Sequence, residues 1–301
     1  MNLSETTTVC FVASYAVALS MELVGLVRRV GWRRMVMLGF AFAGVFAHVV
    51  FLVNQTRDST APLASPAEWS SVAALTLACI YLFSSFTTPR QAIGLFLLPL
   101  VLLLLGVSAL ASDEPFATQR ASIFWGRVHG WLLMLATVTV IVGFLAGVMY
   151  LIQSWRLKHK LPPDSRFRLP SLEALETTNA RSLAVSVALV AGGFASGLVL
   201  AGLRQSQGQG QLWRDPLVIS LTVMLVWLVA AELFRLLYPS ARRGRKVAYL
   251  TVASFGFLMI VLASMLVSGG AHGAGDAAES APVVGSTAAL PPSPFRPQPS
   301  P

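Results

Sequence analysis

The chain has 301 residues, of which 55% are hydrophobic and only 12% are charged, and its net charge at pH 7 is +9. Soluble domains carry about a quarter charged residues, so this composition excludes an ordinary soluble fold and indicates a protein of the lipid bilayer. The cations stand in short clusters between apolar runs, which is the pattern of membrane-protein loops and not of a nucleic-acid surface.

Eight apolar segments are long enough to cross a membrane, since a spanning helix needs roughly 20 apolar residues. The sequence predicts them at residues 8–27, 34–53, 70–87, 92–111, 125–152, 182–203, 216–237 and 247–268. The fifth is long enough to project beyond the membrane. The first is expected to be a retained helix and not a signal peptide, because its cations follow the apolar run. The predicted fold class is all-α, a polytopic membrane helix bundle of about eight transmembrane helices.

The charge of the loops predicts the orientation of the bundle. The loops after the first, third, fifth and seventh segments hold sixteen of the 22 Lys and Arg residues. By the positive-inside rule, these loops face the cytoplasm. An even number of helices then places both termini outside the cytoplasm, in a multi-pass protein of the inner (plasma) membrane.

The largest basic loop follows the fifth segment, which a pair of prolines ends. Ser171 is a candidate N-cap for a short helix over 169–176, which we expect to lie on the membrane surface. The predicted membrane domain covers residues 1–270. Residues 271–301 are rich in Gly, Ala and Pro, and they are expected to form a disordered tail outside the cytoplasm.

Three of the four histidines fall near the outer ends of predicted helices. His48 lies in the second segment, His129 in the fifth, and His272 just after the eighth, whereas His159 sits among cytoplasmic cations as an ordinary solvated residue. Imidazole is a preferred axial ligand of haem iron, so two of these residues could clamp a planar macrocycle at the outer surface. The alternative is that each histidine hydrogen-bonds a neighbouring helix.

Aromatic and charged residues accompany these histidines. Trp125 and Arg127 precede His129, and the arginine is an outer cation able to pair with the carboxylates of a ligand. Trp213, in the loop before the seventh segment, is either an interfacial anchor or a surface on which a flat ligand stacks. Asp215 is a candidate cap of the seventh helix.

Polar residues inside the apolar runs are few. Glu232 and Arg235 are spaced to neutralise each other on one helix, and Glu22 near the inner end of the first segment is similar. Such isolated groups do not favour an ion pathway. Gly143 and Gly147 fit close helix packing. The chain has no nucleophile elbow, P-loop, dinucleotide fingerprint or HExxH motif, so a stand-alone enzyme is not expected.

An ordered set of motifs covers the chain from about residue 10 to residue 273. It includes WGRVHG at 125–130, LPSLE at 169–173, LWRDP at 212–216, RRGRKVAY at 242–249 and SFGF at 254–257. In this order the chain resembles the cytochrome c assembly membrane protein family, which includes CcsA- and ResC-type proteins and smaller HemX- and YpjD-like members.

The resemblance implies non-covalent haem at the outer face, presented for attachment to apocytochrome c together with other maturation proteins of the membrane. By position, His129 and His272 match the two axial ligands of the haem iron, and His48 matches a histidine of HemX-like members. Trp213 and Asp215 remain from the family's Trp-rich loop, whose other positions are Gln and Gly here. The alternative is a HemX-like scaffold or regulator of tetrapyrrole synthesis or cytochrome maturation, without a cofactor of its own.

Overall fold

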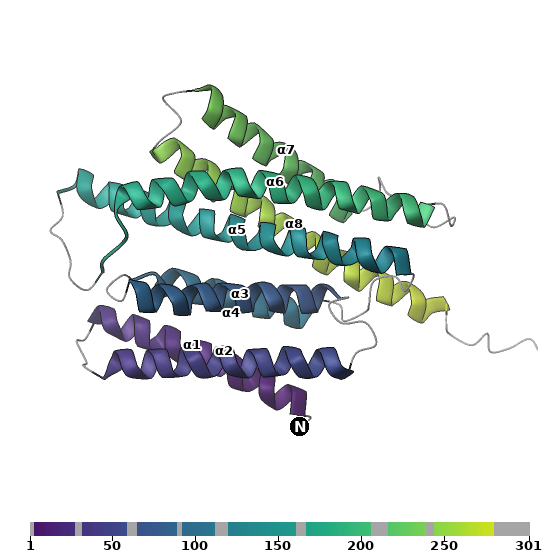
Figure 1. Ribbon diagram of the computed structural model, residues 1–301, viewed down its shortest axis with the longest axis horizontal. Coiled ribbons are helices and arrows are strands. Elements are labelled where there is room, and N and C mark those ends of the chain that lie inside the picture. Colours follow the sequence, from purple (N-terminus) through teal and green to yellow (C-terminus); the bar gives the residue numbers. More distant parts are fainter. Residues whose placement is uncertain are drawn as a thin grey trace, which may run out of the picture.

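The computed structural model describes residues 3–27, 32–58, 65–88, 92–111, 120–160, 167–205, 216–238 and 244–279. Every regular element in these ranges is an α-helix, as Figure 1 shows. The helices are α1 (Leu3–Val27), α2 (Arg33–Asp58), α3 (Pro66–Thr87), α4 (Gly94–Leu110), α5 (Arg120–Lys158), α6 (Leu172–Gln205), α7 (Pro216–Leu237) and α8 (Arg245–Glu279). Each corresponds to one predicted segment, so the all-α membrane bundle is confirmed.

Among the described residues, seven helices are long and apolar enough to cross a membrane. The exception is α4, whose 17 residues span about 25 Å, somewhat less than the roughly 30 Å of a bilayer's hydrocarbon core. It is apolar along its whole length and packs against α3 and α1. At 39 residues α5 is the longest helix, as the sequence predicted, and it ends before the proline pair.

The helices stack in layers, with α5 in the middle (Figure 1). α1 and α2 pair with each other, and α3 and α4 form the next layer. α5 then packs against α3 on one side and against α6 and α8 on the other, while α7 lies at the edge on α8 and α6. Residues on opposite faces of α5 therefore contact different layers of the bundle.

The two ends of the bundle differ in chemistry. We call the end where α2 and α6 finish and α3 and α5 begin the histidine end, because His48 and His129 lie toward it. We call the opposite end the basic end, where Arg33 opens α2, Arg156 lies in the last turn of α5 and Arg245 opens α8. α1 begins and α8 finishes toward the histidine end (Figure 1).

A capping box starts α3 at the histidine end. The Ser65 hydroxyl accepts a hydrogen bond from the Glu68 backbone N–H at 3.2 Å, and the Glu68 carboxylate accepts one from the Ser65 N–H at 3.3 Å. Pro66 occupies the first turn, where its missing N–H costs nothing. These reciprocal bonds satisfy N–H groups that a helix start otherwise leaves unpaired.

Small residues let α5 approach its neighbours closely just beyond its midpoint, on the side of the basic end. A methyl group added to Gly143 would lie 3.0 Å from the Ser182 Cβ atom on α6. One added to Gly147 would lie 3.0 Å from the carbonyl oxygen of Ala248 on α8. Close backbone approach of this kind replaces the hydrophobic driving force that is missing between helices in lipid.

A buried asparagine joins three helices at the same level. Asn179 is 2% exposed. With its amide oriented to suit its neighbours, the nitrogen donates to Thr251 Oγ1 at 2.6 Å and to the Gly143 carbonyl at 3.3 Å, and the oxygen accepts from the Ala248 N–H at 3.2 Å. α5, α6 and α8 are thus tied by one side chain, in a place where its polar atoms have no water to bind.

The prediction of a separate surface helix over 169–176 is wrong. Ser171 does act as an N-cap, since its hydroxyl accepts from the Ala174 N–H at 3.3 Å. The helix that it starts is α6 itself, which runs for 34 residues without a break. Leu175 is 3% exposed and belongs to the core, so its apolar face packs inside the bundle and not on the membrane surface.

At the other end of the chain, α8 continues past residue 268, where the last predicted segment ends, to Glu279. The remainder of the predicted tail, residues 280–301, lies outside the described residues.

Replacing Asn179 by leucine is expected to lower the free energy of unfolding by about 1–2 kcal/mol, because three interhelical hydrogen bonds are lost. Thermal melting of the purified protein in detergent checks this. Thr178→Leu is the matched control, because Thr178 is the exposed neighbour on the same turn. Equal melting temperatures for the two variants would show that Asn179 does not join the helices.

Candidate functional site at the histidine end

His129 projects from α5 toward α6. Its Nδ1 atom lies 2.7 Å from the Gly193 carbonyl oxygen and 3.2 Å from Ser196 Oγ. A carbonyl only accepts, so Nδ1 carries the proton and donates it. In the neutral imidazole the lone pair is then on Nε2. Histidines that ligate a metal commonly use a backbone carbonyl in this way to fix the ring and its tautomer.

The imidazole of His129 rests on a glycine surface of α6. A Cβ atom added to Gly197 would lie 3.0 Å from the His129 Cε1 atom and 3.3 Å from Nδ1. Gly193 and Gly197 are one helical turn apart, which is the small-xxx-small spacing that opens a shallow track along a membrane helix. The ring therefore lies in this track, directly against the α6 backbone.

Gly130, the next residue along α5, faces α3 instead of α6. A Cβ atom on Gly130 would collide with the indole ring of Trp69 on α3. Trp69 is buried, and its ring meets Trp131 edge-on, with 5.3 Å between the ring centroids. Sequence reasoning missed Trp69, which stands just before the predicted start of the third segment. The Ser-x-x-Glu capping box at residues 65–68 was the available signal that the helix begins before Trp69 and includes it.

His48 occupies a different environment from His129. It is fully buried, with Nε2 2.9 Å from Ser71 Oγ and Nδ1 3.4 Å from Tyr15 Oη. The Phe11 ring stacks on it at 4.4 Å between centroids. Both ring nitrogens thus have partners on neighbouring helices, and one face of the ring is covered by Phe11. This is the arrangement described by the alternative reading, in which the histidine joins helices.

α3 separates the two histidines. Ser71, which bonds His48, and Trp69, which contacts α5, point to opposite faces of that helix, because they are two residues apart. The structure therefore does not bring His48 and His129 into one site.

Of the remaining predicted site residues, the structure describes the side chains of two and not those of the other three. Trp125 is partly exposed at the start of α5, with its ring edge-on to Phe124, and Arg127 is exposed. His272 falls within α8, but its side chain lies outside the described part of the chain, as do Trp213 and Asp215. The pairing of His129 with His272 stays a prediction.

No group of three or more His, Cys, Asp or Glu side chains in the described ranges is arranged to hold a metal ion. A site that cages a bare metal ion is therefore not seen in this part of the molecule. Haem requires less of the protein, because the macrocycle supplies four ligands and only axial positions are left to side chains. A single oriented imidazole such as that of His129 fits that requirement.

Two pairs of oppositely charged residues within the helices contact each other. On α7, Arg235 Nε donates to Glu232 Oε2 at 2.8 Å, and a second nitrogen of the guanidinium contacts Oε1, which confirms the predicted pair. Glu22 on α1 pairs with Arg33 on α2 at 3.4 Å, and the Tyr81 hydroxyl also donates to Glu22. Both pairs lie toward the basic end, away from His129.

Comparison with known proteins agrees with the order of motifs. The model of the cytochrome C assembly protein family matches residues 34–272, a stretch that includes all the predicted histidine positions. The chain is 23% identical over 220 residues to the cytochrome c biogenesis protein CcsA of two strains of Heterosigma akashiwo. The match covers 60% of this chain and 65% of those relatives, slightly less than two thirds of their length. No solved structure matches the chain.

Replacing Gly130 by alanine is expected to destabilise the protein by about 1–3 kcal/mol, because the new methyl group overpacks against the rigid Trp69 ring. Gly126→Ala is the control, since Gly126 lies one turn earlier on α5 with open space around its Cα atom. Both changes improve helix propensity equally. Thermal melting of the two variants in detergent compares them, and a Gly130→Ala protein as stable as Gly126→Ala would contradict this packing.

Proposed function

The chain belongs to the cytochrome c assembly protein family, and from that membership we propose that it handles haem in cytochrome c biogenesis. The observation that carries the proposal is the His129 imidazole, whose Nδ1 atom is held by the Gly193 carbonyl so that Nε2 bears the lone pair. The haem would be held non-covalently, as cargo or as a resident group, in a multi-pass protein of the plasma membrane.

The neighbours of His129 each have a role in this proposal. Gly197 leaves room for the ring, and a larger residue would push it from its position. Trp69 packs on the other side of α5 and keeps the helix from shifting. Arg127 is exposed near the start of α5, and in this proposal its long, flexible side chain reaches around the helix to a propionate carboxylate near the membrane surface.

Three further residues complete the proposed pocket. His272 would hold the haem iron together with His129, and Trp213 and Asp215 would contribute to the same pocket. Bound haem would supply an iron whose axial positions are open to imidazole nitrogen. The chain's own contribution is to orient the imidazoles, exclude water from them and hold the ligand's carboxylates.

In this proposal His48 joins helices outside the haem pocket and is not a ligand. Its contacts to Tyr15 and Ser71 join α1, α2 and α3, and Phe11 occupies one face of its ring. Ligation by His48 would require breaking a hydrogen bond inside the bundle and moving that phenyl ring.

An accessory role is favoured over complete haem attachment. The loop before α7 has Gln and Gly at most positions where the family's tryptophans are expected. Haem-channel members of the family are expected to carry a histidine in the seventh helix, but here that helix has none and holds the Glu232–Arg235 pair instead. We therefore place this protein with the HemX-like members, acting beside other membrane proteins of cytochrome c maturation.

The protein purified from haem-replete cells is expected to show a Soret band. The double change His129→Ala/His272→Ala should reduce haem per chain by at least about tenfold, since even the loss of a hydrogen-bond partner of a metal ligand lowers metal affinity 10–100-fold. His48→Gln is the control and should keep the band while lowering the melting temperature. An absent band in the unchanged protein, or an unaltered band in the double variant, would contradict haem handling and favour the cofactor-free scaffold.

The histidine end is proposed to face away from the cytoplasm. In a chain whose native Cys10 and Cys79 are replaced by alanine, single cysteines at Arg57 and Lys160 report the two ends, because both positions are exposed. A membrane-impermeant maleimide should label Arg57→Cys in intact cells, and Lys160→Cys only after the membrane is opened. The opposite labelling would reverse the proposed orientation.

A further inference from the structure

Ser196 on α6 contacts the His129 ring beside the Gly193 carbonyl. Its Oγ atom lies 3.2 Å from His129 Nδ1, and the residue is 4% exposed, so the contact is shielded from water. The Ser196 hydroxyl donates to the Gly193 carbonyl at 2.8 Å, a bond that serines commonly form within helices. Its hydrogen is thereby used, and the oxygen lone pairs of Ser196 are what the imidazole meets.

The Nδ1–H group of His129 therefore has two acceptors. The Gly193 carbonyl oxygen lies at 2.7 Å and Ser196 Oγ at 3.2 Å, which is the arrangement of a three-centre hydrogen bond. Each acceptor attracts the same proton. Acceptors on the far nitrogen of a ligating imidazole fix its orientation and raise the basicity of the nitrogen that faces the metal.

Packing holds the part of α6 that carries both acceptors. A Cβ atom on Gly193 would lie 2.5 Å from the Leu133 Cδ2 atom, and one on Gly192 would lie 3.5 Å from Leu132 Cδ1. These two leucines follow His129 by one turn on α5. The helix that bears the ring thus also fixes the distance to its acceptors, and the ring is oriented before any ligand binds.

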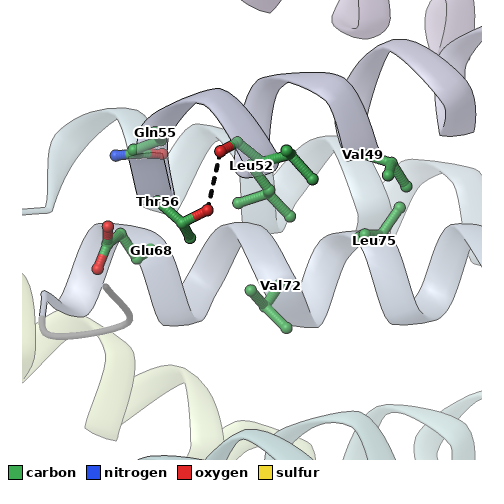
Figure 2. Close-up of a pocket in the computed structure, with 8 residues that line it drawn as sticks. Val49, Leu52, Gln55, Thr56, Glu68, Val72 and Leu75 are labelled. Carbon is green, nitrogen blue, oxygen red and sulfur yellow. Dashed lines mark hydrogen bonds between the residues drawn. The ribbon is translucent and has the colours of Figure 1, made fainter. Parts of the chain in front are cut away.

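These contacts lie apart from the groove between α2 and α3 that Figure 2 shows. The groove has a cavity volume of about 200 Å³ and is lined only by residues of those two helices, from Val49 to Thr56 and from Glu68 to Leu75. This cavity therefore has no part in holding the Nδ1 atom.

We propose that Ser196 is a positioning residue that biases the site toward ferric haem. Ferric iron carries one more positive charge than ferrous iron, so a more basic axial nitrogen stabilises it more. Ser196 acts only through the His129 ring and does not touch the iron. The preference for one oxidation state of the ligand thus rests on the proposed function.

Ser196→Ala removes the second acceptor and leaves the Gly193 carbonyl in place. The preference for ferric over ferrous haem should fall about threefold, the size of one neutral hydrogen bond. At 59 mV per tenfold, this is an upward shift of about 30 mV in the midpoint potential. A spectroelectrochemical titration of the Soret band of the haem-loaded full chain in detergent measures it.

Ser186→Ala is the matched control. Ser186 is a buried serine of the same helix whose hydroxyl donates to the Ser182 carbonyl at 2.7 Å. It lies ten residues before Ser196, about 15 Å along the helix axis, so its loss should leave the potential unchanged. Ser196→Cys places the weakly accepting sulfur beside the ring and should shift the potential upward as well. It decides the question if the alanine variant fails to fold.

Three results would overturn the proposal. An unaltered potential in Ser196→Ala would remove the role of Ser196 while leaving haem handling in place. An equal shift in Ser186→Ala would attribute the effect to the loss of any buried serine. An absent Soret band in the unchanged protein would overturn haem handling itself, and the preference for ferric haem with it.

Discussion

Two contacts of adjacent residues set the position of α5, and much of the bundle depends on them. Gly130 lies against the Trp69 ring of α3, and His129 lies in the glycine track of α6. In lipid there is no hydrophobic driving force for apolar helices to associate, because acyl chains are equally apolar. Close packing and interhelical hydrogen bonds must therefore stabilise the bundle. The same contacts that hold α5 in the middle of the bundle also orient the one described imidazole suited to ligation.

Sequence reasoning reached the fold because the bilayer allows few solutions. Only helices of about 20 apolar residues satisfy their own backbone groups in lipid, so the number and order of the spans follow from hydropathy. It could not separate the roles of the histidines. His48 and His129 occupy similar depths, but the first is enclosed by Phe11, Tyr15 and Ser71. Side-chain packing determines which face of a helix contacts which neighbouring helix, and hydropathy alone does not predict it.

The error over residues 169–176 has a similar origin. The cap at Ser171 was correctly identified, but an amphipathic start was interpreted as a helix lying on the membrane. The structure continues that start into the 34-residue α6, because Leu175 finds a buried place in the core. Trp69 was overlooked for the converse reason: its residue type suggests an interfacial anchor, whereas its contact with Gly130 is a matter of tertiary arrangement.

The lack of space around the imidazole has an evolutionary consequence. Residue 197 is glycine, and any larger residue would place a Cβ atom only 3.0 Å from the ring of His129. The two positions therefore cannot change independently. A lineage that exchanged the histidine for a small residue would release position 197 to accept side chains that are excluded here. Glycine at 197 should therefore accompany histidine at 129 among homologues, and their joint loss would mark branches in which this ring no longer serves a purpose.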